Sequence, residues 1–149
     1  MITVPTKIPE TELEKYGVVS NHELMDNGQL RFRLSGSDGS GYIRCENRGD
    51  PAWENSHSHS EMSELVLVQR GTVVFADYAD GKVSFTVLNE GDFILSQPGI
   101  PHNEILSKGA VIHTLKHGNC SSPDWIPCPQ LDALTKHLTF KEAFKAAKK

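Results

Sequence analysis

The chain has 149 residues, of which 38% are hydrophobic and 23% charged, a composition typical of a globular protein with one domain. Its net charge of −4 disfavours a nucleic-acid partner, because such binding depends on basic patches. We expect no membrane span and no signal peptide, since the sequence has no apolar run of about 18 residues and no apolar segment near the N-terminus.

The sequence contains three cysteines, Cys45, Cys120 and Cys128. They form no C-x-x-C pair, and their odd number leaves one thiol over. This pattern disfavours a disulfide scaffold and fits a reducing compartment. We therefore expect a cytoplasmic protein.

The first predicted element is a short helix over residues 9–17, ended by Gly17 in a left-handed conformation. Between residues 29 and 117, short runs of β-branched and aromatic residues alternate with turn residues. The expected strands span 30–35, 41–46, 64–69, 72–78, 82–88, 92–96, 103–106 and 110–117. Asp80 and Gly81 predict a two-residue hairpin turn, because both can adopt a positive φ. The close spacing of the strands favours an all-β sandwich or barrel.

A second helix is predicted over residues 140–148, near the end of the chain. Thr139 and Glu142 fit a capping box at its start. The apolar side chains that share one face of this helix are Phe140, Ala143, Phe144 and Ala147. Such a face docks either on the barrel or on a second subunit.

These patterns predict a single domain in three segments. Residues 1–28 form a helix and lead-in arm, residues 29–117 form the barrel, and residues 118–149 form a loop and the final helix.

The segment HSHSEMSE, residues 57–64, carries the strongest signal for a functional site. In an extended chain His57 and His59 point to the same side, with roughly 6–7 Å between their side-chain origins. Two imidazoles at that separation can bind one metal ion. Glu64 begins an apolar strand after a turn, and His102 follows a Pro-Gly turn, so both could reach the same ion.

The spacing around the histidine pair resembles the first sequence motif of the cupin superfamily. That motif reads G-x5-H-x-H-x(3,4)-E-x6-G. The stretch from His57 to Gly71 matches it, and only the leading glycine differs, since Pro51 takes its place.

A second stretch resembles the second cupin motif, G-x5-P-x-G-x2-H-x3-N. Gly91, Gly99 and His102 match, although Gln97 replaces the proline and Leu106 replaces the final asparagine. The resemblance covers residues 29–117, and neither terminus contributes to it.

The resemblance implies an all-β, cupin-type double-stranded β-helix (jelly-roll) barrel with short flanking helices at both termini. It also implies one divalent metal ion, bound by His57, His59, Glu64 and His102. Imidazole suits Fe, Zn and Ni, and the carboxylate also admits Mn, so the identity of the metal stays open. Glu64 could be a ligand or could move away to act as the catalytic base.

Four further residues are candidates for substrate binding. Tyr42 and Arg44 share one strand face; if it points inward, Arg44 could bind an anionic group, and if outward both are surface residues. Glu104 shares a face with His102. His113 could line the cavity as a proton shuttle or be a histidine with no role in the site.

The resemblance implies a metal-dependent enzyme acting on a small oxygenated metabolite, either a dioxygenase or an isomerase or lyase of sugars or hydroxy acids. Because one barrel hosts many chemistries, a non-catalytic module that binds or senses a small molecule is the alternative. We expect a homodimer, with no nucleic-acid or membrane partner.

Overall fold

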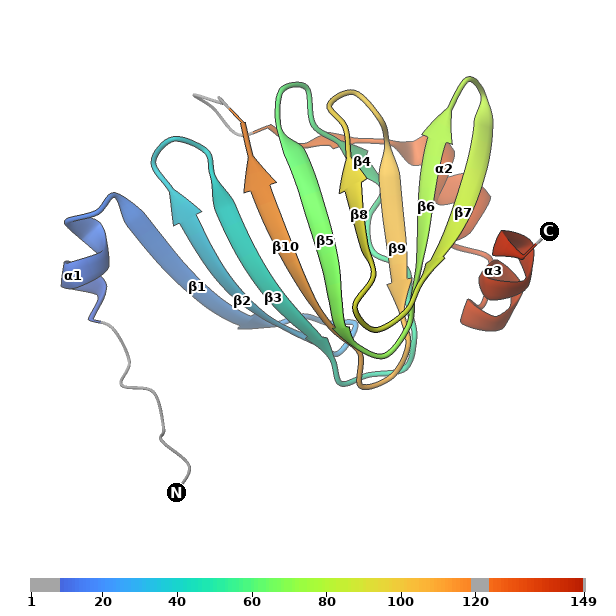
Figure 1. Ribbon diagram of the computed structural model, residues 1–149, viewed down its shortest axis with the longest axis horizontal. Coiled ribbons are helices and arrows are strands. Elements are labelled where there is room, and N and C mark those ends of the chain that lie inside the picture. The colour runs from blue at the N-terminus through green and yellow to red at the C-terminus, as the bar shows by residue number, and fades with distance from the viewer. Residues whose placement is uncertain (1–8, 119–123, 149) are drawn as a thin grey trace.

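The computed structural model describes residues 9–118 and 124–148. Two antiparallel β-sheets pack face to face, and short helices lie near both ends of the chain (Figure 1). The helices are α1 (Glu10–Glu14), α2 (Pro129–Thr135) and α3 (Phe140–Ala147). In the described ranges, no helix combines the length and the hydrophobicity needed to span a membrane.

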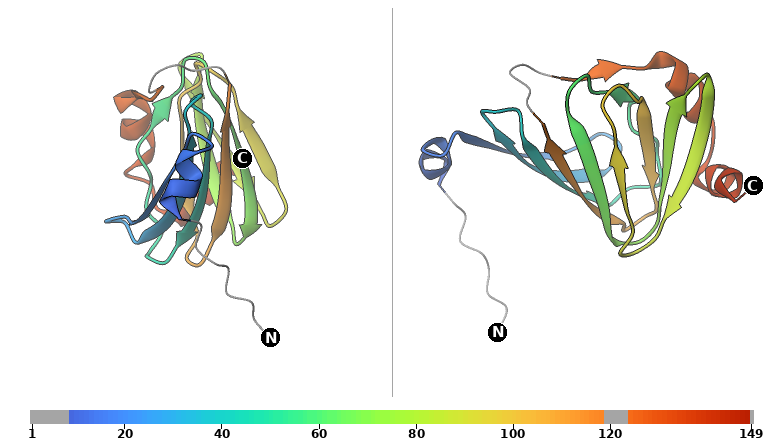
Figure 2. Two further views of the ribbon diagram at one scale, coloured as in Figure 1. Left: turned by 90° about the vertical axis from the view of Figure 1, so that its left-hand side faces the viewer. Right: turned by 45° about the horizontal axis from the view of Figure 1, so that its top comes forward.

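The strands of the described residues divide into a larger and a smaller sheet, which Figure 2 shows as facing layers. The larger sheet has the order β1 (Val18–Leu24), β2 (Gln29–Gly36), β3 (Gly41–Asn47), β10 (Val111–His117), β5 (Ser63–Arg70) and β8 (Phe93–Ser96). The smaller sheet has the order β11 (Ile126–Pro127), β4 (His57–Ser58), β9 (His102–Leu106), β6 (Val73–Ala79) and β7 (Lys82–Leu88). The expected all-β jelly-roll class is confirmed.

The hydrophobic core lies between the two sheets. Along β5, Val66 and Val68 are buried in it, whereas Leu67 between them points outward, as the two-residue period of a strand requires. The residues of this core cluster are Cys45, Val66, Val68, Val73, Phe75, Leu88, Leu106, Ala110 and Ile112. Both sheets contribute to it, so the barrel has a core that does not depend on the helices.

The helices near the C-terminus cover the outer face of the smaller sheet. Ala143 of α3 packs with Val74 and Ile105, and Leu131 of α2 packs with Ala76. The capping box of Thr139 and Glu142 is present at the start of α3. The apolar face of α3 therefore docks on the barrel, which is one of the two partners expected for it.

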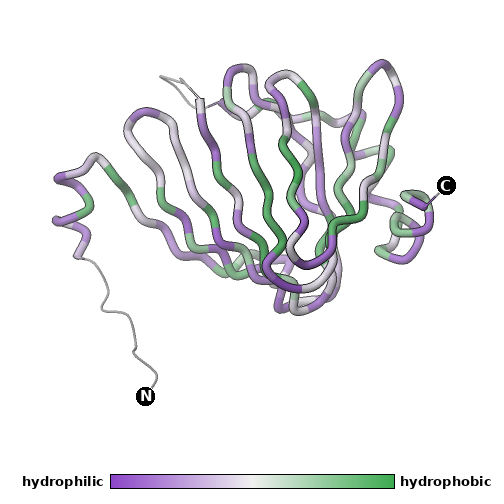
Figure 3. The backbone as a smooth tube through the Cα atoms, in the orientation of Figure 1, coloured by the Kyte–Doolittle hydropathy of each residue, from purple (hydrophilic) through white to green (hydrophobic). Residues whose placement is uncertain are grey.

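The outer face of the larger sheet is not covered in the same way. Helices α2 and α3 both pack on the other sheet, and Figure 1 shows no helix in front of β3, β10, β5 and β8. Figure 3 shows hydrophobic residues along β5 and β8. The exposed apolar side chains of this face include Leu34, Leu67, Phe93, Leu95 and Leu115.

All eight expected strands are present within two residues of their predicted ends. The hairpin turn is confirmed, because Asp80 and Gly81 have φ values of 53° and 74°. Helix α1 is shorter than expected, and Gly17 follows it with φ of 65°. Four elements were not predicted, namely β1, β4, β11 and α2. Strands β4 and β11 have two residues each, too few for any periodicity.

Candidate metal centre

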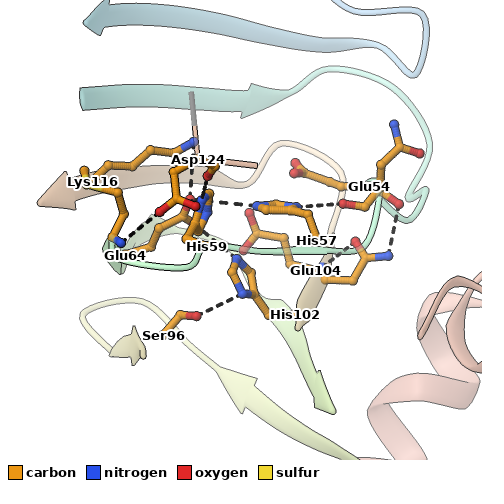
Figure 4. A network of polar contacts seen from close by, with 12 residues as sticks. Glu54, His57, His59, Glu64, Ser96, His102, Glu104, Lys116 and Asp124 are labelled. Carbon is orange, nitrogen blue, oxygen red and sulfur yellow. Dashed lines mark hydrogen bonds and ion pairs between the residues drawn. The ribbon is translucent and has the colours of Figure 1, made fainter. Parts of the chain in front are cut away.

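Four side chains from both sheets meet at one point beside the core (Figure 4). His57 lies on β4 directly opposite His102 of β9, His59 follows β4, and Glu64 lies on β5. One ligand atom from each residue lies within 4.8 Å of all the others. His59, Glu64 and His102 are buried, and His57 is half-buried. The structure thus brings together all four residues expected to bind a metal.

The carboxylate of Glu64 lies at the middle of this cluster. Its Oε1 is 2.5 Å from His59 Nε2 and 3.8 Å from His57 Nε2, and its Oε2 is 3.3 Å from His102 Nε2. Two ligands of one ion, each about 2.1 Å from it, lie about 3.0–3.4 Å apart at angles between 90° and tetrahedral. The observed separations bracket this range.

Each histidine is oriented by an oxygen acceptor at its Nδ1. The main-chain contacts are His57 Nδ1 to Asn55 O at 2.9 Å, His59 Nδ1 to Asp124 O, and His102 Nδ1 to Ile100 O at 3.1 Å. Because a carbonyl oxygen can only accept, each Nδ1 carries the hydrogen. Each Nε2 then presents its lone pair toward Glu64, which is how second-shell contacts prepare a histidine for metal binding.

The converging atoms need a cation between them. His59 Nε2, His102 Nε2 and Glu64 Oε1 are buried and have no hydrogen-bond partner among the described residues. Lone pairs that face a carboxylate repel it unless a proton or a metal ion lies between them, and unpaired buried polar atoms are costly. The donor set of three imidazoles and one carboxylate therefore fits a divalent metal ion.

The electrostatics of the cluster keep Glu64 ionised. Burial alone would raise the pKa of Glu64, but the contacts with the three histidines and the charge of Lys116 hold that pKa well below its usual value. Burial works against a charged His59 as well, yet Glu64 and the carbonyl of Asp124 raise the pKa of His59. Without an ion, a proton is thus held where the metal would bind.

Asp124 supports the site and was not recognised in the sequence. Its carboxylate accepts hydrogen bonds from the main-chain nitrogens of Ser60, Glu61 and Met62 at 2.6, 2.9 and 3.1 Å. These contacts lower the pKa of Asp124 well below its usual value. The residue fixes the loop between the histidine pair and Glu64, but it lies about 60 residues further along the chain, so no local pattern indicates it.

Lys116 is a second residue that the sequence did not reveal. It lies on β10 directly opposite Glu64 of β5, and its Nζ is 3.3 Å from Glu64 Oε1. The candidate predicted from the sequence on β10 is His113, and Lys116 lies on the opposite face of that strand. The two-residue period of the strand would have placed Lys116 on the same side as the buried Thr114.

A cavity of about 160 Å³ adjoins the cluster and is lined by His57, Glu64 and His102. Glu104 lines it, is nine-tenths buried, and has no hydrogen-bond partner at Oε2 among the described residues. Burial, together with the charges of Glu54 and Glu64, raises the pKa of Glu104 well above its usual value. These surroundings favour the protonated form of this side chain, which lines the cavity.

The structure does not bring Tyr42, Arg44 and His113 to the cavity. They lie on the outer face of the larger sheet, because Ile43 and Cys45, which alternate with Tyr42 and Arg44 along β3, point inward, and His113 of β10 pairs with Arg44. The Tyr42 hydroxyl lies 2.8 Å from His113 Nδ1, and Arg44 lies 3.4 Å from Glu46. Among the four candidates for substrate binding, Glu104 is the one that lines the cavity.

The thiol of Cys45 also lines the cavity, but it is not one of the four clustered ligands. It is buried in the core, and burial, with the nearby charge of Glu54, raises its pKa to about 12. It remains a neutral thiol and packs as a small hydrophobic side chain.

No protein-family model matches the sequence, and no curated protein is similar to it. Solved structures are similar in fold. The cupin domain of Drosophila melanogaster CENP-C, 17% identical, gives a TM-score of 0.55 over 76% of this chain and 86% of that one. The same domain has been solved bound to CAL1, at 20% identity and a TM-score of 0.52 over 66% of this chain and 76% of that one.

Oxalate decarboxylases are also similar. A mutant of the Bacillus subtilis enzyme, 17% identical, gives a TM-score of 0.61 over 85% of this chain, which spans 34% of the enzyme. The Lactobacillus farciminis enzyme in complex with formate, 16% identical, gives 0.56 over 77% of this chain and 35% of that one. A further structure of the Bacillus subtilis enzyme concerns its Mn(II) centres. The chain therefore has a cupin fold, as the sequence motifs implied.

Proposed function

We propose that the protein is a metal-dependent enzyme that acts on a small oxygenated metabolite, with a mononuclear centre formed by His57, His59, Glu64 and His102. One observation carries the proposal. The three Nε2 atoms and a buried carboxylate converge on one point, and each imidazole is fixed from behind by a main-chain oxygen. This arrangement adjoins a cavity lined by polar side chains, which favours a working site over a structural one.

A divalent ion held here would supply a Lewis acid and a template for a substrate with adjacent oxygen atoms. In this proposal Glu64 is a ligand rather than a mobile base, which its contacts with the three histidines and Lys116 support. Glu104 holds a proton at the cavity wall. Trp125 stacks on His57, with 5.3 Å between ring centroids, and lines the same cavity.

Metal analysis of the purified protein, combined with turnover assays, tests the proposal. The assays use a panel of diketones, sugars and hydroxy acids with and without chelator. Iron would favour dioxygenase chemistry, whereas zinc or manganese would favour isomerase or lyase chemistry. A protein that holds no metal at neutral pH after supply of each ion would refute the proposal.

The second candidate is a non-catalytic module that binds or senses a ligand. It is favoured by the similarity to the CENP-C cupin domain, which was solved bound to another protein, CAL1. Stoichiometric metal and saturable ligand binding without turnover of any panel compound would support this candidate instead.

Two further expectations belong to the proposal. Cys45 and Cys128 are free thiols, in agreement with a reducing compartment such as the cytoplasm. The protein is proposed to act as a homodimer.

A further inference from the structure

Three basic side chains line the cavity beside the metal centre, and their counter-charges differ. Each of the two arginines has a carboxylate partner that is not a metal ligand. These pairs are Arg31 with Glu54 at 2.9 Å and Arg33 with Glu23 at 2.5 Å. The third cation is Lys116, whose carboxylate partner is Glu64, a proposed metal ligand.

Metal binding therefore leaves Lys116 without a full counter-charge. A divalent ion retains one positive charge after it binds Glu64, and Lys116 Nζ adds a second charge only 3.3 Å from that carboxylate. Both charges lie next to a partly enclosed cavity, where effective dielectric constants are lower than in water. An anion at an open coordination position balances this excess, whereas a neutral ligand does not.

The cavity also restricts the size of the ligand and indicates its second polar group. A volume of about 160 Å³ holds about five water molecules at about 30 Å³ each. Glu104 Oε2 faces this space, nine-tenths buried and without a hydrogen-bond partner in the described ranges. A hydroxyl group can both donate and accept, so it would satisfy this atom.

We propose that Lys116 is a substrate-binding residue and that the cavity takes a small hydroxycarboxylate. Its carboxylate binds at the open positions of the metal centre and contacts Lys116 Nζ, while its hydroxyl group reaches Glu104. This inference rests on the proposed metal centre.

The test compares glycolate with glycolamide, its neutral counterpart of similar shape, by calorimetric titration of the metal-loaded full chain. We expect glycolate to bind at least about tenfold more tightly, because a charge contact of this kind contributes on that order. Lys116→Met should lower glycolate affinity about tenfold without lowering metal content. Lys116→Arg should keep the affinity. The matched control is Lys108→Met, since Lys108 pairs with Asp50 on the surface.

Equal affinity of the native chain for the two compounds, or unchanged affinity in Lys116→Met, would overturn the inference. If Lys116→Met loses its metal, the inference is judged instead from the affinities of the native chain and of Lys116→Arg for glycolate and glycolamide. A native chain that binds no metal refutes the metal centre itself. A chain that binds metal but does not prefer glycolate refutes only the role of Lys116.

A second inference concerns the outer face of the larger sheet, which no part of the metal centre uses. Five apolar side chains on it are 38–64% exposed, namely Leu34, Leu67, Phe93, Leu95 and Leu115. Strand register places them in two adjacent rows. One row runs across the sheet in the order Leu34, Tyr42, Leu115, Leu65 and Leu95, and in the other Leu67 lies beside Phe93. Together they expose on the order of 400 Å² of contiguous apolar surface, in the range of patches that are often functional.

The polar side chains of this face can be covered without leaving a charge unpaired. His113 contacts the Tyr42 hydroxyl at 2.8 Å and Gln69 Oε1 at 2.6 Å, and Arg44 pairs with Glu46. Because the charges pair within the face, no single sign of charge selects an oppositely charged partner. An apolar face whose charges are paired within it can pack against the same face of a second copy, as a two-fold interface requires.

The size of the face agrees with a stable dimer. Six strands about 4.8 Å apart and about seven residues long form a face roughly 24 Å by 23 Å. Projecting side chains raise its accessible area further, toward the about 800 Å² per partner of standard interfaces. We infer that a second copy of this chain packs on this face and forms a homodimer.

The mass of the full chain in solution, measured by sedimentation at micromolar concentration, tests this inference. We expect a dimer, and Phe93→Lys combined with Leu115→Lys should give a monomer with unchanged metal content. Leu134→Lys is the matched control, since Leu134 is an exposed leucine on α2, away from this face. A native chain that is monomeric, or a double variant that stays dimeric, would overturn the inference.

Discussion

Removing the metal ion should lower the melting temperature by about 8–16 °C while leaving the barrel folded. An ion that binds only the native state, at a free concentration a thousandfold above Kd, adds about 4 kcal/mol to the free energy of unfolding. For a domain of this size, each kcal/mol shifts the melting temperature by about 2–4 °C. The ligands lie on β4, β5 and β9, so the ion cross-links the two sheets.

The barrel should remain folded because its core is separate from the ligands. The core cluster between the sheets consists of buried hydrophobic residues from both of them and includes none of the four ligands. This arrangement differs from that of small zinc domains, which unfold when their metal is removed.

The assay is thermal unfolding of metal-loaded and chelated protein, followed by circular dichroism, with metal content measured in each sample. The His102→Ala variant is the control, since chelation should not change its melting temperature. An unchanged melting temperature after proven loss of metal would refute the linkage. Complete unfolding at room temperature would instead identify a structural site.

Four further predictions concern the same centre. His102→Ala should abolish stoichiometric metal, whereas Glu61→Ala should not, because Glu61 is exposed and outside the cluster; elemental analysis distinguishes them. Metal occupancy should fall between roughly pH 6 and pH 4.5, because protons compete with the metal for the histidines. The measurement is metal content over a pH series, and an occupancy that does not change with pH would indicate other ligands. In the metal-free protein the raised pKa of His59 contributes stability that is complete below about pH 6.5 and lost as pH rises through the raised value, so the unfolding midpoint should fall as the pH is raised above about 6.5. Asp124→Asn should weaken metal affinity about 10–100-fold, as measured by competition with a chelating dye, since the loop that carries His59 loses its charged acceptor.

The strands and the four metal-binding candidates could be predicted because their signals are local. Strand β7 alternates apolar and polar residues, β5 contains a short apolar run, and His57, His59 and Glu64 lie within one short segment. His102 lies outside this segment, and it was predicted from the second motif.

The rest of the site depends on contacts between distant parts of the chain. Asp124 reaches the histidine loop from a segment that follows the barrel, and Lys116 is recognised only once its strand is paired with that of Glu64. The orientation of Arg44 was open in the sequence because half-buried strand faces can point either way. Strand β1 was missed because polar residues interrupt its apolar pattern, and its tertiary position at the sheet edge tolerates them.

The three histidines of the metal centre donate hydrogen bonds to main-chain oxygens, and this affects how the sequence can diverge. The oxygens behind His57, His59 and His102 include the carbonyls of residues 55, 124 and 100. A substitution changes a side chain but leaves a carbonyl in place, so exchanges at these three positions can keep the acceptors as long as the backbone keeps its path. The orientation of the imidazoles is therefore inherited with the course of the loops rather than with particular amino acids. Evolutionary drift around such a site can be extensive, and its relatives would be recognised by shape long after their sequences have ceased to align.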